Sequence, residues 1–151
     1  MQAKAVAAAI RKDNSKAADI FICGVTGVNF VINGLYSPTE ETGQDGRVLY
    51  RKNGDGALCI EHFEGRWCVK NQSDRGSVTC FAYVEGGCAL EDCRPQKSFL
   101  RTWKVSDGKH FFEQTSVVII VKGRKSQSQA SGSSDPASEH TVLLPSILLC
   151  V

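Results

Sequence analysis

The stretch Ala57-Leu-Cys-Ile-Glu-His-Phe63, Glu64-Gly65, Arg66-Trp-Cys-Val-Lys70 has the pattern of a β-hairpin. Two runs rich in β-branched and aromatic residues flank a two-residue turn sequence, and a turn of that length fixes how the strands pair. We therefore expect Phe63 to lie opposite Arg66, and His62 opposite Trp67. Alternation then places one set of side chains on one face, Ile60, His62, Trp67 and Val69, and another set on the opposite face, Cys59, Glu61, Cys68 and Lys70.

Similar short runs, separated by Gly, Asp and Asn turns, extend in both directions from this hairpin. No helical period interrupts them after residue 18, so the pattern predicts an all-β domain over 19–122, built as a compact antiparallel sandwich or small barrel. The expected strands are 19–25, 28–36, 47–52, 57–63, 66–70, 77–85, 98–105, 109–112 and 115–121.

Two of these runs carry specific expectations. Side chains in residues 77–85 alternate between the two faces of a predicted strand. Both faces are apolar enough that we expect each to be covered by other parts of the protein. The unbroken β-branched run 117–121 is typical of a central strand buried on both sides. The predicted core contains Ile20, Ile22, Val28, Phe30, Ile32, Leu49, Ile60, Trp67, Val69, Phe81, Trp103, Val105, Phe112, Val118 and Ile120.

The two flanks differ from the β domain in composition. Residues 1–18 form a short amphipathic pattern, which predicts a helical lead. Residues 123–151 are rich in Ser and Gly and have little to bury before residue 141, so they are predicted to be a disordered tail. The apolar end of that tail, 141–151, is too short to cross a bilayer and contains Pro145.

Several motifs in the β region resemble a small all-β module that recurs, sometimes in tandem, in multidomain proteins of protists and other eukaryotes. They are the Asn33-Gly-Leu-Tyr36 turn, Gly46-Arg-Val-Leu-Tyr-Arg-Lys52, Trp67-Cys-Val69 and Trp103-Lys-Val105. The resemblance spans residues 20–121 and implies the β fold and a non-catalytic role. No catalytic or ligand-binding residue is established for the module, and the closely spaced cysteines at 80, 88 and 93 depart from its pattern.

Composition excludes several classes of partner. The net charge of +2 provides no large field to attract nucleic acid. No apolar run reaches the length of a membrane-spanning helix, and the N-terminal segment lacks the order of an export signal. We therefore expect a cytoplasmic protein that binds neither nucleic acid nor membrane, with seven cysteines that are reduced and mostly buried.

A zinc site is the most specific chemical hypothesis that the sequence offers as an alternative to an interaction module. Cys80, Cys88 and Cys93 offer thiolate ligands, with His62, Cys59 or Cys68 as a fourth. The spacing lacks the paired C-x2-C arrangement of strong zinc signatures. A structural zinc site is therefore the second hypothesis, and no cofactor is expected under the first.

Catalysis is the third hypothesis, in the form of a small hydrolase. Only His62, His110 and His140 are available as imidazole bases, and neither a G-x-S-x-G elbow nor an H-E-x-x-H pair is present. Nothing in the sequence brings one of these histidines to a particular cysteine. No catalytic residue is assigned, and the protein is predicted not to be an enzyme.

The first hypothesis is a non-catalytic interaction or scaffold module that binds a protein partner. Aromatic side chains on a β scaffold are the residue type that such surfaces use. The candidates are Trp67, Tyr83, Trp103 and Phe111, although aromatic residues in a domain of this size also belong to the core.

Overall fold

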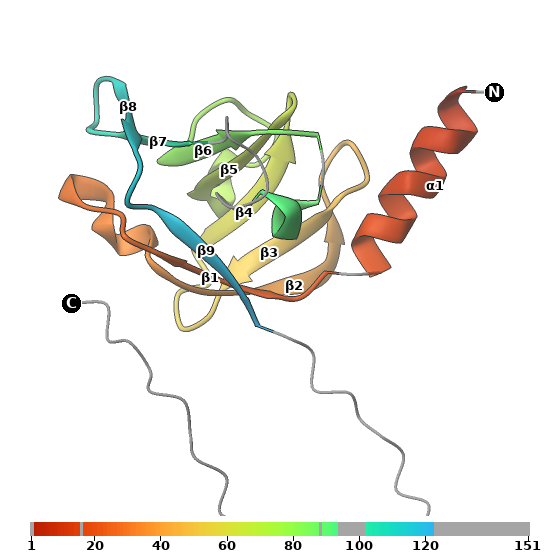
Figure 1. Ribbon diagram of the computed structural model, residues 1–151, viewed down its shortest axis with the longest axis horizontal. Coiled ribbons are helices and arrows are strands. Elements are labelled where there is room, and N and C mark those ends of the chain that lie inside the picture. The colour runs from red at the N-terminus through yellow and green to blue at the C-terminus, as the bar shows by residue number, and fades with distance from the viewer. Residues whose placement is uncertain (1, 16, 88, 94–101, 123–151) are drawn as a thin grey trace, which may run out of the picture.

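The computed structural model describes residues 2–15, 17–87, 89–93 and 102–122. It contains one α-helix, three 3-10 helices and nine strands among these residues (Figure 1). Their bounds are α1 (Gln2–Ser15), β1 (Asp19–Cys23), η1 (Gly27–Ile32), β2 (Gly34–Thr42), β3 (Val48–Lys52), β4 (Leu58–Phe63), β5 (Arg66–Asn71), η2 (Gln72–Asp74), β6 (Ala82–Glu85), η3 (Leu90–Asp92), β7 (Trp103–Ser106), β8 (Phe111–Gln114) and β9 (Val118–Lys122). The tail predicted for 123–151 lies outside the described residues.

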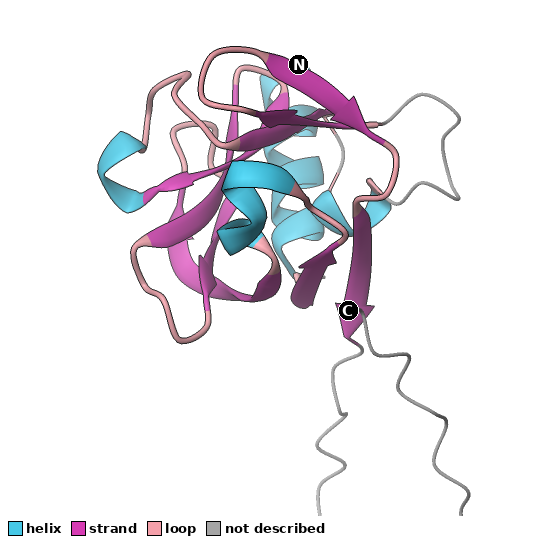
Figure 2. Ribbon diagram, turned by 90° about the vertical axis from the view of Figure 1, so that its left-hand side faces the viewer, coloured by secondary structure: helices cyan, strands magenta, loops and turns pink. Residues whose placement is uncertain are grey.

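All nine strands belong to one antiparallel sheet in the order β8-β7-β6-β5-β4-β3-β2-β1-β9. The sheet is a meander that curls into a half-barrel, as Figures 1 and 2 show from two sides. Its two outermost strands, β8 and β9, are consecutive in the chain, so the segment 111–122 pairs first with β7 and then with β1. The predicted all-β antiparallel class is confirmed, as a single curled sheet.

Hydrogen bonds from the β8–β9 segment to the chain after β1 hold the curl together. The Thr26 N–H donates to Gln114 Oε1 at 3.1 Å, and Gln114 Nε2 donates to the Thr26 carbonyl at 3.3 Å. The Ser116 hydroxyl donates to the carbonyl of Gly24 at 2.8 Å. Gly24 has a φ of 87°, and a Cβ there would lie 2.0 Å from the Ser116 carbonyl oxygen. This contact requires a residue without a side chain.

Replacing Gly24 by alanine is therefore expected to destabilise the protein by about 2–3 kcal/mol, through left-handed backbone strain and a backbone clash. Gly54 is the matched control, because its φ is 79° and a Cβ there meets nothing within 4 Å. Gly54→Ala introduces only the backbone strain, without a clash, and is expected to lower the free energy of unfolding by about 1 kcal/mol. Urea unfolding of both variants measures the difference, and equal losses would show that the close approach at Ser116 is unimportant.

The predicted hairpin is confirmed residue by residue. β4 pairs with β5 in the expected register, with Phe63 opposite Arg66 and His62 opposite Trp67. Glu64 and Gly65 have φ values of 47° and 78°. Positive φ at both positions is the signature of a type I′ turn, whose twist matches that of the flanking strands.

The core occupies the inside of the curl. It holds both tryptophans, with Trp67 2% and Trp103 1% exposed. η3 contributes Leu90, and Cys93 follows it into the same cluster. The remaining buried members come from every strand except β8 and from the segments beside the strands, and include Ile20, Ile22, Tyr36, Tyr50, Ile60, Val69, Ala82, Val84, Val105, Val117 and Ile119.

The strand predicted at 28–36 is wrong in its first half. Residues 27–32 form the 3-10 helix η1, and the strand begins only at Gly34. Val28 and Phe30, predicted as core, are 68% and 62% exposed, whereas Ile32 is buried. The helix turns the chain between β1 and β2, so its side chains are not constrained by the pleat of the sheet.

Two other strand predictions need correction. β9 is an edge strand with alternating exposure, so Val117 and Ile119 are buried while Val118 and Ile120 are 39% and 47% exposed. β6 begins only at Ala82, because residues 77–81 lie in a bend before the sheet. Phe81 is partly buried against the core and the predicted core residue Phe112 is 54% exposed.

The helix α1 lies beside the sheet and is attached near its C-terminal end (Figure 1). Asn14 Nδ2 donates to the Gly46 carbonyl at 2.8 Å, and Asn14 Oδ1 accepts the Val48 N–H at 3.0 Å. Along the described part of the chain, no helix combines the length and apolarity that crossing a membrane requires.

Candidate functional site

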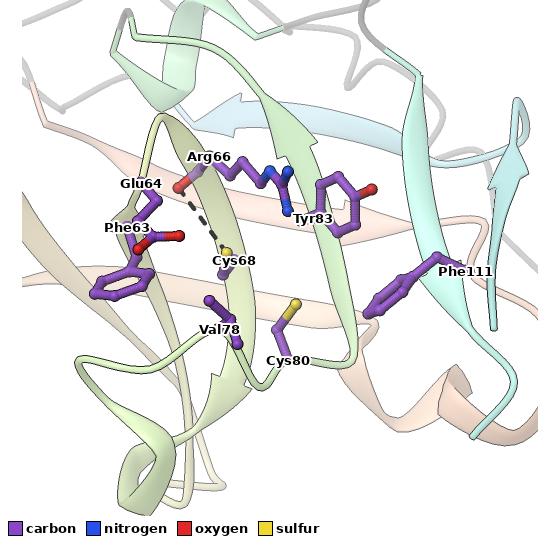
Figure 3. A pocket seen from close by; sticks show the side chains of 8 residues that line it. All are labelled: Phe63, Glu64, Arg66, Cys68, Val78, Cys80, Tyr83 and Phe111. Carbon is purple, nitrogen blue, oxygen red and sulfur yellow. Dashed lines mark hydrogen bonds between the residues drawn. The ribbon is translucent and has the colours of Figure 1, made fainter. Parts of the chain in front are cut away.

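A small hollow on the outer face of the sheet is lined by two cysteines together with an arginine, a glutamate and a tyrosine (Figure 3). Alternation along β5 and β6 turns Arg66, Cys68 and Tyr83 outward, and β8 adds Phe111 from the neighbouring edge. The bend before β6 brings Val78 and Cys80 over the same face. The hollow has a volume of about 40 Å³, far below the roughly 300–1,000 Å³ of small-molecule pockets.

Tyr83 is the centre of an aromatic and cationic cluster at this hollow. The rings of Tyr83 and Phe111 meet edge to face with centroids 5.1 Å apart. The guanidinium of Arg66 lies 4.7 Å from the Tyr83 centroid and Lys104 Nζ lies 5.7 Å from it. Cation–π contacts of this kind hold charged side chains against an aromatic face. The structure thus brings together two of the four predicted binding aromatics.

The other two, Trp67 and Trp103, belong to the interior. Trp67 contacts Tyr50 and His62 edge to face, with centroid distances of 6.0 Å and 4.9 Å. Their near-complete burial means that they stabilise the fold and present no surface to a partner.

Two thiols meet in the hollow. Cys68 and Cys80 both line it, and the Cys68 thiol donates to the Arg66 carbonyl at 4.0 Å. The neighbouring Cys80 thiol raises the pKa of Cys68, with burial acting in the same direction. The neighbouring Cys68 thiol lowers the pKa of Cys80 against the opposing effect of partial burial, and the charges of Lys70 and Arg66 lower it further.

The residues predicted for zinc are dispersed. Cys93 is buried in the core, where its thiol donates to the Ala89 carbonyl at 3.6 Å, whereas Cys80 lies on the outer face. His62 Nδ1 is 2.5 Å from Asp45 Oδ2, and its Nε2 is 2.9 Å from the Gly86 carbonyl oxygen. Cys88 lies outside the described residues. Within those residues, no three potential ligands are grouped so that they could hold a metal ion.

A buried ion pair supports the strands beneath the hollow. Lys70 Nζ lies 3.1 Å from Glu61 Oε2 and donates to the Ser77 carbonyl at 2.6 Å. Glu61 Oε2 also accepts the Gly76 N–H at 2.9 Å. Both charged side chains are almost fully buried, at 0% and 2% exposed. The pair therefore joins the β4–β5 hairpin to the bend that carries Cys80.

The sequence analysis missed a second surface, which we call the apolar end. It consists of Val28, Phe30 and Val31 of η1 with Phe111 and Phe112 of β8, whose side chains point to opposite faces of that strand. η1 and β8 lie at the same end of the molecule (Figures 1 and 2), and Asn29 Nδ2 of η1 donates to the Ser106 carbonyl of β7 at 2.5 Å. All five side chains are between 42% and 68% exposed.

A signal for η1 does exist in the sequence. Val28, Phe30, Val31 and Ile32 are apolar without the strict alternation of a half-buried strand, and glycines flank the run at Gly27 and Gly34. Such a run is compatible with a turn that exposes part of its apolar surface.

Comparison with known protein families, with curated proteins and with solved structures finds no match for this chain. The resemblance to the recurring β module therefore stays a prediction, and the functional argument depends on the geometry described above.

Proposed function

We propose that the protein is a non-catalytic interaction module that binds a neutral, apolar segment of a partner protein through the apolar end. The observation that carries this proposal is the exposure of five large apolar side chains on η1 and β8, which both lie beside Ser106 of β7. Soluble domains seldom expose grouped apolar side chains of this size without a partner.

Local charge favours a neutral partner. Asp107, in the turn before β8, accepts the backbone N–H groups of Lys109 and His110 at 2.8 Å each, so its carboxylate is occupied in holding the turn. Lys104 is 4.0 Å from Glu85 and also lies over Tyr83. Because Asp107 and Lys104 are engaged locally, binding at the apolar end is expected to depend mainly on apolar burial.

The described cavities support a binding role over a catalytic one. The hollow at Cys80 has little free space, as its volume shows. A wider depression of about 490 Å³, lined by residues 42–44, Glu61, Gln72, Arg75 and Gly76, is shallow and open to solvent. Its charged groups are paired, Arg75 with Glu41 at 2.6 Å and Glu61 with Lys70. The proposal keeps the predicted cytoplasmic location, in which the thiols would be reduced.

Panning of a displayed peptide library against the full chain tests the proposal. We expect enrichment of peptides with several aromatic or aliphatic residues and little net charge. The Phe30→Ser/Phe112→Ser variant should bind an enriched peptide at least about tenfold more weakly, because both side chains would be anchors of the interface. The matched control is Val6→Ser/Ile120→Ser, which removes two exposed apolar side chains elsewhere, 59% and 47% exposed, and should leave the affinity unchanged.

Other results would overturn the proposal. Equal affinity loss in both double variants would show that apolar exposure in general, and not the apolar end, drives binding. A dimer in sedimentation that Phe30→Ser/Phe112→Ser converts to a monomer would make a second copy of the chain the occupant. Enrichment of strongly acidic or basic peptides would contradict the neutral partner.

A further inference from the structure

Cys68 and Cys80 come from different segments and line one hollow (Figure 3). Cys68 is fixed in the middle of β5, where its neighbour across the ladder is Tyr83. Cys80 lies in the bend before β6, and the Phe81 N–H donates to the Val69 carbonyl at 2.8 Å, which holds the end of that bend against β5. Both thiols line the same small hollow of about 40 Å³, so they lie close together.

Cys80 differs from the other described cysteines in its access to solvent. Cys23, Cys59, Cys68 and Cys93 are buried, whereas Cys80 is only partly so. Cys59 faces outward from the same sheet, but burial and the neighbouring Glu61 raise the pKa of its thiol to about 11. Oxidants act on accessible thiolates, so Cys80 is the described thiol best placed to react first.

The charged groups around Cys80 favour its thiolate. Arg66 lines the hollow, and its guanidinium lies over the Tyr83 ring. Lys70, on the same strand, forms the buried ion pair with Glu61. Glu64 is the acidic residue on the rim of the hollow, at the exposed hairpin turn. Two cations of β5 therefore favour the Cys80 thiolate, and the neighbouring Cys68 thiol acts in the same direction.

We propose that Cys80 is a peroxide-sensitive thiol and that Cys68 resolves its oxidised form as a Cys68–Cys80 disulfide. The Cys80 thiolate attacks one oxygen of hydrogen peroxide, so that an S–O bond forms, the O–O bond breaks, and the leaving hydroxide takes up a proton to become water. Cys68 then attacks the sulfenic sulfur, forming the S–S bond and breaking the S–O bond. The departing hydroxide takes the Cys68 proton, so two thiols and one peroxide give one disulfide and two waters.

The disulfide would tie the bend at 77–81 covalently to β5. A cross-link over such a short connection restricts the unfolded chain, so the oxidised protein is expected to unfold at a temperature higher by roughly 5 °C. The inference is independent of the proposed function, because it depends on the thiol pair and not on the apolar end.

Stoichiometric hydrogen peroxide is added to the reduced full chain, and free thiols are blocked before digestion with trypsin. We expect a disulfide-linked pair of peptides, 67–70 and 76–97, with fragmentation placing the second sulfur at Cys80. The Arg94–Pro95 bond resists trypsin, so Cys80, Cys88 and Cys93 share that peptide and fragmentation is required. In Cys68→Ser, dimedone should trap a sulfenic acid on Cys80.

Two variants complete the test. Cys80→Ser should slow the loss of the Cys68 thiol by at least about tenfold, and the matched control Cys59→Ser, which removes a buried thiol from the same face, should leave that rate unchanged. A bridge that maps to Cys88 or Cys93, an unreacted Cys80 in the wild-type protein, or equal rates in Cys80→Ser and wild type would each overturn the proposal.

Discussion

Replacement of Lys70 by alanine is expected to lower the free energy of unfolding by about 3–5 kcal/mol. The substitution leaves Glu61 buried, 2% exposed, with the Gly76 N–H as its remaining hydrogen-bond donor among the contacts described. An uncompensated carboxylate in the interior is costly because water cannot solvate it. Urea unfolding followed by tryptophan fluorescence measures the loss.

Two variants separate the buried charge from a general effect of mutation. Glu61→Gln/Lys70→Met removes both charges while the new amide oxygen can still accept the Gly76 N–H, so it should recover most of the lost stability. Arg51→Ala breaks an exposed pair, Arg51 with Glu41 at 2.5 Å, and should cost less than about 1 kcal/mol. If Lys70→Ala costs no more than Arg51→Ala, the pair does not hold β4, β5 and the Cys80 bend together.

Truncation of Trp67 to alanine is expected to cost about 3–5 kcal/mol as well. The indole is 2% exposed and contacts both Tyr50 and His62 edge to face, so its removal leaves a cavity at the centre of the curled sheet. Thermal unfolding of the variant, scanned at fixed concentration, provides the measurement.

Trp103→Phe is the contrasting substitution for Trp67→Ala. Trp103 is as deeply buried, yet its Nε1 has no hydrogen-bond partner among the described residues. Phenylalanine keeps an aromatic ring and removes that polar group, so the cost should stay below about 1.5 kcal/mol. A large loss in Trp103→Phe combined with a small one in Trp67→Ala would contradict the assignment of Trp67 as the central core residue.

The parts of the fold that local chemistry decides were predictable from sequence. The Glu64-Gly65 turn requires positive φ at two successive residues, and this requirement fixes the register of the whole β4–β5 hairpin. Contact between His62 and Trp67 follows directly from that register. The all-β class follows from the repetition of such runs along the chain.

Errors arose where position in the sheet decides exposure. The run 117–121 is apolar throughout, but β9 lies at an edge, and composition does not distinguish an edge strand from a central one. Val28 and Phe30 were assigned to a strand because η1 is short, and a 3-10 helix of six residues leaves no helical period to detect. The second error concealed Val28 and Phe30, two of the five residues of the apolar end.

The candidate site was only partly visible in the sequence. Of the four aromatics that the sequence suggests for binding, Tyr83 and Phe111 lie together at the outer hollow, whereas the two tryptophans belong to the core. Cys80 lies close to Cys68 because a bend precedes β6, which begins only at Ala82. The sequence pattern predicts one continuous strand over 77–85 and does not reveal this bend. Long-range contacts of this kind depend on loop paths that local patterns do not specify.

Amide NMR of the isotope-labelled full chain, titrated with a neutral apolar peptide selected from the library, tests the central claim most directly. The proposed interaction module predicts that the largest shift changes fall in residues 26–32 and 103–114, around the apolar end, and that they disappear in Phe30→Ser/Phe112→Ser. Shift changes concentrated at residues 42–44 and 72–76, in the open polar depression, would contradict the account.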